Sequence, residues 1–211
     1  MESSQLLNKF YEKLQIAIAR NLILGKGLDV SRLKNILAVD SAYRDGELMV
    51  TAGIIWDVEG EEMIKESYII SKPTYSYIPG LLYVREAPAI LELVEKIDYP
   101  WDLLLVDGHG ILHPRRAGLA VVVGFILDKP VVGVAKKLLV GKEVGEGREG
   151  PIYLDGELSG YWFKDEKKFY VSPGYKVRVE DIVGVIRLLG GRYPKPLEIA
   201  DKLARKKISG V

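Results

Sequence analysis

Apolar residues recur every three or four positions near the start of the chain, a spacing typical of one face of a helix. They are Leu7, Phe10, Tyr11, Leu14 and Ile18. The pattern predicts an amphipathic helix over residues 4–24. Because Gly25 and Gly27 follow it at once, and glycine favours helix ends, we expect the helix to end there.

The pattern then changes to runs rich in β-branched and aromatic residues, over residues 36–43, 47–56 and 64–71. The turn signals RDG and VEGEE separate these runs. Connections this short join antiparallel neighbours, so the runs predict a three-stranded antiparallel meander.

A loop rich in Pro, Tyr and Gly, PTYSYIPG, leads into a predicted helix over residues 81–97, with Pro88 near its first turns. Beyond it we expect strands over residues 102–108 and 130–136, with a helix between them over residues 115–128. Each strand is apolar on both faces, which is typical of parallel strands covered by helices on both sides. This part of the chain is therefore predicted to be α/β.

The rest of the chain predicts three short strands and two helices, separated from the preceding strand by a Gly-rich charged surface loop, GKEVGEGREG, over residues 141–150. The strands are expected over residues 151–154, 159–163 and 168–174, and the helices over residues 179–189 and 196–207.

We expect one domain over residues 1–211, because no repeat or interdomain linker interrupts the chain. Its predicted class is α/β: a central mixed sheet, with an antiparallel three-strand meander followed by parallel strands, flanked by helices. This order of elements resembles the ribonuclease H-like layout, although a fold alone does not determine a function.

The composition restricts the chemistry. The chain has no cysteine, which excludes disulfides, thiolate catalysis and zinc sites built on cysteine. Its net charge is only +1, so a nucleic-acid partner would have to bind local clusters of basic residues. With no membrane-spanning apolar run and no signal-peptide pattern at the start, we expect a soluble, cytoplasmic monomer with no membrane partner.

Two aspartates lie at positions that suggest a function. At one position a carboxylate is costly to bury, and at the other it lies where ligands commonly bind. Asp40 lies inside an apolar strand, so its charge needs compensation by a cation or by hydrogen-bond donors. Asp107 ends the run LLLV and precedes GHG, at the carboxyl edge of a parallel strand, where α/β folds bind ligands. The alternatives are that Asp40 is an acid at a strand end and that Asp107 makes only a local turn hydrogen bond.

Three other charged residues could form one site with these two aspartates. Glu86 lies on the helix after YIPG, Asp201 lies on the last helix, and Lys136 closes the strand VVGVA. Each alone is an ordinary solvated residue. Together the four acids suit a hard divalent cation, and Lys136 adds a positive charge that would stabilise a scissile phosphate. The set predicts metal-assisted hydrolysis of a phosphodiester.

Six strings occur in order within residues 36–201: AVDSAY, YIPGLLYVRE, VDGHGILHPRRAG, VGVAKK, VSPG and RYPKPLEIAD. In this order and spacing the chain resembles the endonuclease V family, also called deoxyinosine 3′ endonuclease or deoxyribonuclease V. The resemblance implies that Asp40, Glu86 and Asp107 are catalytic metal ligands and that Lys136 is the catalytic lysine. Asp201 stands at a fourth ligand position, where some members carry His.

The resemblance also implies how a lesion is held. Tyr77, Ile78 and Pro79 match a wedge that fills the gap left by an extruded base, which is chemically reasonable for a rigid apolar loop. A Pro-containing turn with a core tyrosine is the alternative. The positions implied to wall the pocket for the extruded base are Gly80, Gly108 and Gly133, and His113 matches a substrate-site histidine. Basic residues that could meet phosphates are Arg115, Arg116, Lys136, Lys137 and the tail ARKK.

The implied reaction is hydrolysis of the second phosphodiester on the 3′ side of a deaminated purine, above all inosine, leaving 3′-hydroxyl and 5′-phosphate ends in DNA repair. The implied cofactor is Mg²⁺, for which Mn²⁺ can substitute, and the implied partner is DNA containing deaminated bases. An inosine-specific ribonuclease, a non-catalytic lesion-binding module and a hydrolase of small phosphate esters remain alternatives.

Overall fold

The predicted meander forms one end of the sheet. In the computed structural model, which describes residues 2–25 and 27–211, β1 (Asn35–Arg44), β2 (Leu48–Asp57) and β3 (Glu62–Ser71) pair antiparallel in sequence order. All three predicted runs are confirmed to within two residues at each end.

The sheet continues from β1 into two parallel strands, β4 (Leu103–Asp107) and β5 (Val131–Ala135). Over the described residues it has nine strands, in the order β3-β2-β1-β4-β5-β9-β8-β7-β6. The last four pair antiparallel: β6 (Lys142–Glu143), β7 (Glu149–Leu154), β8 (Glu157–Lys164) and β9 (Lys168–Tyr175). The segment 141–150, predicted as a loop, therefore contains β6 and the start of β7.

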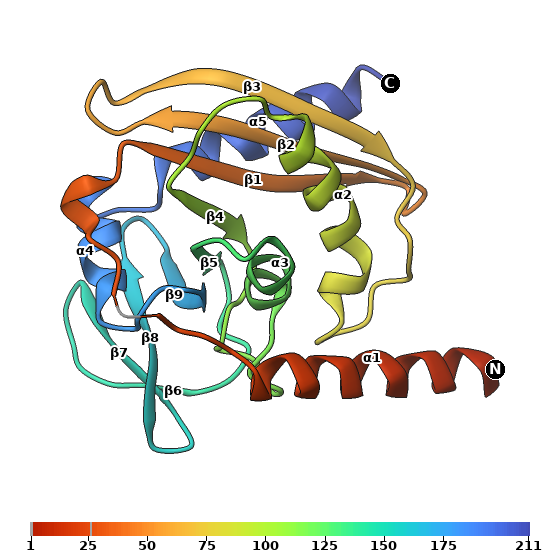
Figure 1. Cartoon of the computed structure of the whole chain (residues 1–211), viewed down its shortest axis with the longest axis horizontal. Helices are drawn as coiled ribbons and strands as arrows, with labels where there is room; N and C mark the ends of the chain where they lie inside the picture. The colour runs from red at the N-terminus through yellow and green to blue at the C-terminus, as the bar shows by residue number, and fades with distance from the viewer. Residues whose placement is uncertain (1, 26) are drawn as a thin grey trace.

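Helices cover both faces of the sheet (Figure 1). In that view α2 (Leu82–Lys96) crosses in front of the meander and α5 (Lys195–Ser209) runs behind it. Apolar residues of α2 and α3 (Leu119–Leu127) build one core, and those of α4 (Asp181–Leu188) and α5 build the other. A short 3-10 helix, η1 (Val30–Arg32), precedes β1.

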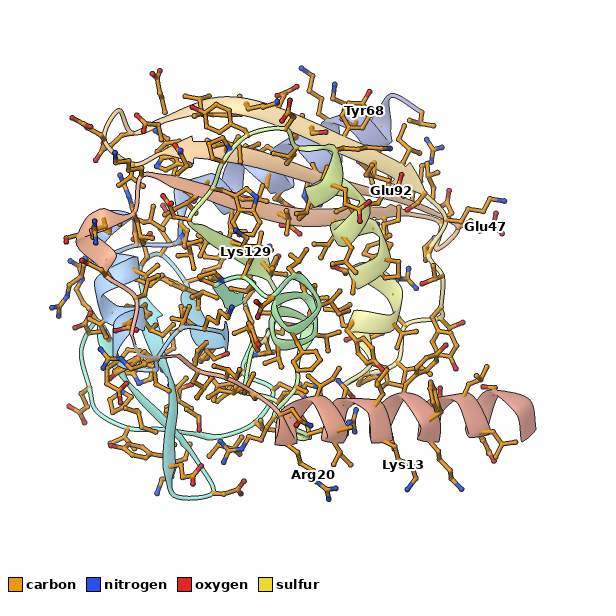
Figure 2. The ribbon with its side chains drawn as sticks, in the orientation of Figure 1. Lys13, Arg20, Glu47, Tyr68, Glu92 and Lys129 are labelled. Atoms are coloured by element: carbon orange, nitrogen blue, oxygen red, sulfur yellow. The ribbon has the colours of Figure 1, made fainter. Side chains whose placement is uncertain are left out.

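The N-terminal helix, α1 (Glu2–Arg20), ends earlier than predicted and packs through only part of its expected apolar face. Leu7, Phe10 and Leu14 are exposed, whereas Gln15 and Ile18 are buried. Lys13 and Arg20 point away from the rest of the molecule (Figure 2). The buried Gln15 therefore contacts the body of the protein at a position that sequence polarity assigned to solvent.

Helix α3 begins at Leu119, four residues later than predicted. The chain before it is instead hydrogen-bonded to the loop after β4: the Gly118 amide donates to the Gly110 carbonyl and the Ala120 amide to the His109 carbonyl. A Cβ on Gly118 would collide with that loop, so glycine is required for this close approach. None of the helices in the described part of the chain is long and apolar enough to cross a membrane.

Candidate active site

Three of the predicted residues meet at one edge of the parallel strands: Asp40 lies within β1 beside the carboxyl end of β4, Asp107 ends β4, and Lys136 directly follows β5. Side chains alternate between the two faces of a strand, and Ile36, Leu103 and Val132 all face the core under α5. Asp40, Asp107 and Lys136 lie an even number of residues further along the same strands, so they point to that same side. The predicted convergence of the strand ends is therefore present.

Lys136 links the two aspartates. Its Nζ lies 2.6 Å from Oδ2 of Asp107 and 3.7 Å from Oδ2 of Asp40. Burial, followed by the negative charge of Asp107, raises the pKa of Asp40 to about 8. Partial burial by itself lowers the pKa of Lys136, but the charge and hydrogen bond of Asp107, together with the charges of Asp40 and Asp201, outweigh it and the pKa is raised. Lys136 therefore remains a cation at neutral pH.

Asp40 is poorly compensated for a buried carboxylate. It is 8% exposed, and its Oδ1 accepts a hydrogen bond of 2.7 Å from the Ser41 amide. Its Oδ2 is buried and has no hydrogen-bond partner among the described residues. An unpartnered buried carboxylate oxygen is costly, and a cation beside it would remove that cost.

Glu86 reaches the same end of the sheet from α2, on the opposite face. It is buried, and its Oε1 accepts a hydrogen bond of 2.6 Å from the Tyr43 hydroxyl. Burial raises the pKa of Glu86 to about 7, partly offset by that hydrogen bond. The Arg85 guanidinium lies 4.2 Å from the centre of the Tyr43 ring. Glu86 is therefore not a solvated surface residue.

Asp201 is half-buried on α5 and engaged by its own helix. Both of its oxygens accept from Nε of Arg205, at 2.9 Å each. Among residues 2–25 and 27–211, no group of three or more Asp, Glu or His side chains is close enough to hold a metal ion unaided. Asp40 and Asp107 thus lie together, while Glu86 and Asp201 form hydrogen bonds with other partners, although the charge of Asp107 acts on Glu86 and that of Asp201 acts on Lys136.

Tyr193, which sequence reasoning did not select, lies beside this centre. Its hydroxyl is buried without a hydrogen-bond partner among the described residues, and its ring centre is 5.8 Å from Nζ of Lys136. Burial, and then the charges of Asp107 and Asp40, raise its pKa. The position follows a loop after α4, so no strand or helix periodicity could have indicated it.

The predicted wedge is an exposed turn. Tyr77 is 65% exposed and Pro79 is also exposed, whereas Ile78 packs partly against the core under α2. The alternative of a core tyrosine is therefore wrong. The Leu81 amide donates to the Ile78 carbonyl at 2.9 Å, and Gly80 has φ +82, a conformation that glycine adopts without strain.

One carbonyl anchors this turn to the body of the protein. The Gly80 oxygen accepts from Nη2 of Arg115 at 2.8 Å and from Nε2 of Gln15 at 3.1 Å. His113 lies 3.1 Å from it through Nε2, while Nδ1 of His113 accepts from the Arg115 amide at 3.2 Å. Nε2 therefore carries the proton and donates to Gly80.

A cavity of about 300 Å³ lies behind the turn, at the lower end of the range for small-molecule sites. Gly80 and His113 line it, as predicted, together with Tyr77. Burial lowers the pKa of His113 to about 4, so this wall is uncharged at neutral pH. The lining residues that sequence reasoning did not select include Gln15, Leu82, Tyr83, His109, Leu138 and Leu139.

Gly108 and Gly133 are not among the lining residues. A Cβ on Gly133 would collide with the backbone of the loop after β4, and one on Gly108 would press on Leu119. These two glycines therefore allow β5 and α3 to pack against that loop. The loop presents His109, whose Nε2 lies 2.9 Å from the Lys137 carbonyl.

Two of the basic residues expected to meet phosphates are directed inward. Arg115 bonds Gln15 and Gly80, and Arg116 donates to Ser159 Oγ and the Leu154 carbonyl at 2.8 Å each. In the tail, Nζ of Lys207 lies 4.4 Å from the centre of the Tyr68 ring, on β3. Lys136 and Lys137 remain the basic residues at the centre.

The sequence of this chain is similar to that of known proteins of one family. The sequence profile of the family described as Endonuclease V matches residues 17–202. The chain belongs to the endonuclease V family. An endonuclease V from Saccharolobus islandicus (strain M.14.25 / Kamchatka #1) is 41% identical over 201 residues, covering 95% of this chain and 96% of that protein. Members of this family are nucleases.

Solved structures of endonuclease V have the same fold. The catalytic domain of the human protein is 25% identical, with a TM-score of 0.85 and 96% of each chain covered. Endonuclease V of Ciona intestinalis was solved with a 24mer DNA containing an inosine followed by a ribo-adenosine. It is 23% identical, with a TM-score of 0.86, covering 100% of this chain and 99% of that one. The ribonuclease H-like fold expected from the element order is confirmed.

Proposed function

We propose that this endonuclease V family member is a metal-dependent endonuclease that recognises deaminated purines, above all inosine, in DNA. It hydrolyses the second phosphodiester on the 3′ side of the lesion. The observation that carries the proposal is the position of the Asp40–Asp107–Lys136 centre beside the cavity behind the Tyr77 turn. Lys137 lines the cavity and directly follows Lys136, so the two sites are one residue apart along the chain.

The donor set at the centre fits a hard divalent cation, for which we propose Mg²⁺, with Mn²⁺ as a substitute. Asp40 and Asp107 would hold it, because Asp40 has a buried oxygen without a partner and the two carboxylates repel one another. Such cations complete their coordination with water. We propose Glu86 and Asp201 as the further acidic ligands.

When bound, a divalent cation supplies Lewis-acid activation of water and of the phosphodiester. In the hydrolysis the water oxygen bonds to phosphorus, the bond from phosphorus to the 3′ oxygen breaks, and a water proton ends on that 3′ oxygen. The products are a 3′-hydroxyl and a 5′-phosphate. The ammonium group of Lys136 stabilises the negative charge that develops on the phosphate.

The cavity and the exposed turn supply recognition of the lesion. An enzyme that reads a damaged base must take it out of the stack, and Tyr77 is exposed where it can fill the gap that the base leaves. The uncharged His113 and the backbone around Gly80 then form a wall for a neutral purine. The inosine-containing DNA bound by the Ciona protein supports the choice of lesion.

The test uses matched strands that differ only in inosine or adenine at one position. With Mg²⁺ the inosine strand should be nicked at the second bond on its 3′ side, and chelator should stop the reaction. Equal cleavage of both strands, or a released base without a nick, would overturn the proposal. Matched RNA strands and free inosine monophosphate, assayed in parallel, separate the ribonuclease and small-ester alternatives.

A further inference from the structure

A second, larger hollow adjoins the centre, and Lys136 is among its lining residues. It has a volume of about 970 Å³ and lies among the turn between β8 and β9 (residues 165–168), the start of α5 (residues 195–202) and the floor residues Phe169 and Tyr193. We call it the basic groove. Lys136 and Lys137 also line it, and Lys137 lines the lesion cavity as well. The two hollows therefore meet at Lys137.

The charge of the basic groove differs from that of the whole chain. Among its described lining residues seven are basic and four are acidic, although the chain as a whole carries only +1. Three of its charged residues are compensated from outside: Lys136 by Asp107 and Asp40, Lys168 by Glu143, and Asp201 by Arg205. The side chains of Lys167, Arg192 and Lys202 are exposed and form no ion pair within the described part of the chain.

The groove offers charge without a platform for stacking bases. Phe169 is 1% exposed, and the half-buried Tyr193 has Nζ of Lys136 over its ring, 5.8 Å from the ring centre. Single-strand sites that hold bases present aromatic faces, whereas sites that hold the backbone present Lys and Arg. The chemistry of the basic groove therefore fits a run of phosphates, read without regard to base sequence.

We propose that the basic groove binds the phosphodiester backbone of the substrate strand on the 3′ side of the scissile bond. This inference rests on the proposed function, in which the lesion occupies the cavity behind Tyr77. If the base lies in that cavity and the scissile phosphate lies at Asp40 and Asp107, the strand that continues past the cut meets Lys136 and then the groove. Lys167, Arg192 and Lys202 neutralise its phosphates.

The test compares Lys167→Ala/Lys202→Ala with the control Lys34→Ala/Lys129→Ala. The control lysines are exposed and precede β1 and β5, at the strand ends opposite Asp40 and Lys136; Lys129 is labelled in Figure 2. Binding is measured in chelator, on inosine strands that end shortly after the cut site or extend about ten nucleotides further on the 3′ or the 5′ side. Unchanged thermal unfolding confirms that each variant is folded.

The wild type and control should bind the 3′-extended strand more tightly than the short one. The groove variant should lose roughly five- to tenfold in affinity for the 3′-extended strand alone, and its salt dependence should be shallower by roughly 0.7 per phosphate contact removed. Equal losses in both double variants, or a loss confined to the 5′-extended strand, would overturn the inference. Failure of the wild type to nick any inosine strand with Mg²⁺ would instead overturn the proposed function, so the two failures are distinguishable.

Discussion

Lys136 Nζ lies 2.6 Å from Asp107 Oδ2, and this ion pair places a permanent positive charge at the carboxyl ends of two parallel strands. Burial alone would lower the pKa of Lys136, but the carboxylate raises it. The lysine therefore cannot act as a neutral base near pH 7, and its function at the centre is electrostatic.

Removing this charge should slow the chemical step. Lys136→Ala should lower kcat on an inosine strand by roughly 10²-fold, because the variant loses a donor to the charge that develops in the transition state. The affinity for the strand in chelator should change much less. Lys129→Ala, which removes an exposed lysine at the other end of β5, is the matched control. A kcat equal to that of wild type would show that Lys136 only forms an ion pair with Asp107 and does not stabilise the transition state.

The exposed Tyr77 provides a test of lesion recognition. Tyr77→Ala should reduce the ratio of affinities for inosine and adenine strands more than it reduces affinity for the adenine strand, because a wedge acts only on an extruded base. Tyr99→Ala, which removes a tyrosine that is 39% exposed near the start of β4, should leave the ratio unchanged. Both affinities are measured at one salt concentration. Equal losses on both strands would show that Tyr77 makes only a general contact.

The anchor of the Tyr77 turn should give the protein a specific pH dependence. Burial lowers the pKa of His113 from 6.5 to about 4, so protons bind the unfolded chain first as the pH falls. Neutral His113 therefore makes its full contribution to the free energy of unfolding above pH 6.5. This contribution is lost as the pH falls toward 4, and the loss is about 3 kcal/mol at most.

Denaturant unfolding across that range measures this loss. His113→Gln cannot take up the proton, so the difference in free energy of unfolding between wild type and variant should shrink as the pH falls. His109→Gln, which changes the other histidine of the chain, is the control. This variant retains His113, so it should still show the fall in free energy of unfolding that protonation of His113 causes. A difference between wild type and His113→Gln that is constant with pH would contradict the assignment of a neutral His113 that donates to Gly80.

Asp201 tests whether α5 contributes a metal ligand. Its carboxylate is held by Arg205 in the structure, so Arg205→Ala should free it and lower the Mg²⁺ concentration for half-maximal nicking. Asp201→Ala should raise that concentration, with a smaller loss at saturation than Asp107→Ala. Asp201→His should retain activity with a preference shifted toward Mn²⁺, because imidazole suits softer ions. An Asp201→Ala titration that overlays wild type would show that α5 provides no ligand.

Sequence patterns were sufficient where one local rule dominates. Apolar runs located β1, β4 and β5, and the shared carboxyl edge of two parallel strands then predicted that Asp107 and Lys136 meet, near Asp40 within β1. The same reasoning failed at α3, because the residues before Leu119 are hydrogen-bonded to the loop after β4, and a sequence pattern does not report such long-range bonds.

Other parts of the site depend on tertiary contacts that carry no periodic signal. Gln15 has the polarity of a surface residue, yet it is buried because the Gly80 and Ala117 carbonyls accept from it. Tyr193 follows a glycine-rich loop, and only the packing of α5 against the sheet brings it beside Lys136. By resemblance Gly108 and Gly133 match positions that wall a pocket. In the structure they do not line the cavity, and their lack of a Cβ instead lets β5 and α3 pack closely against the loop after β4.

In the proposed mechanism Asp40 and Asp107 would hold the cation on which hydrolysis of the strand depends. The most direct measurement is nicking of an inosine strand by Asp107→Asn at saturating Mg²⁺, together with its affinity for the same strand in chelator. Because asparagine keeps the shape of the side chain but removes its charge, nicking should be abolished while binding to inosine remains measurable. An Asp107→Asn variant that keeps more than a small fraction of wild-type nicking would contradict the account.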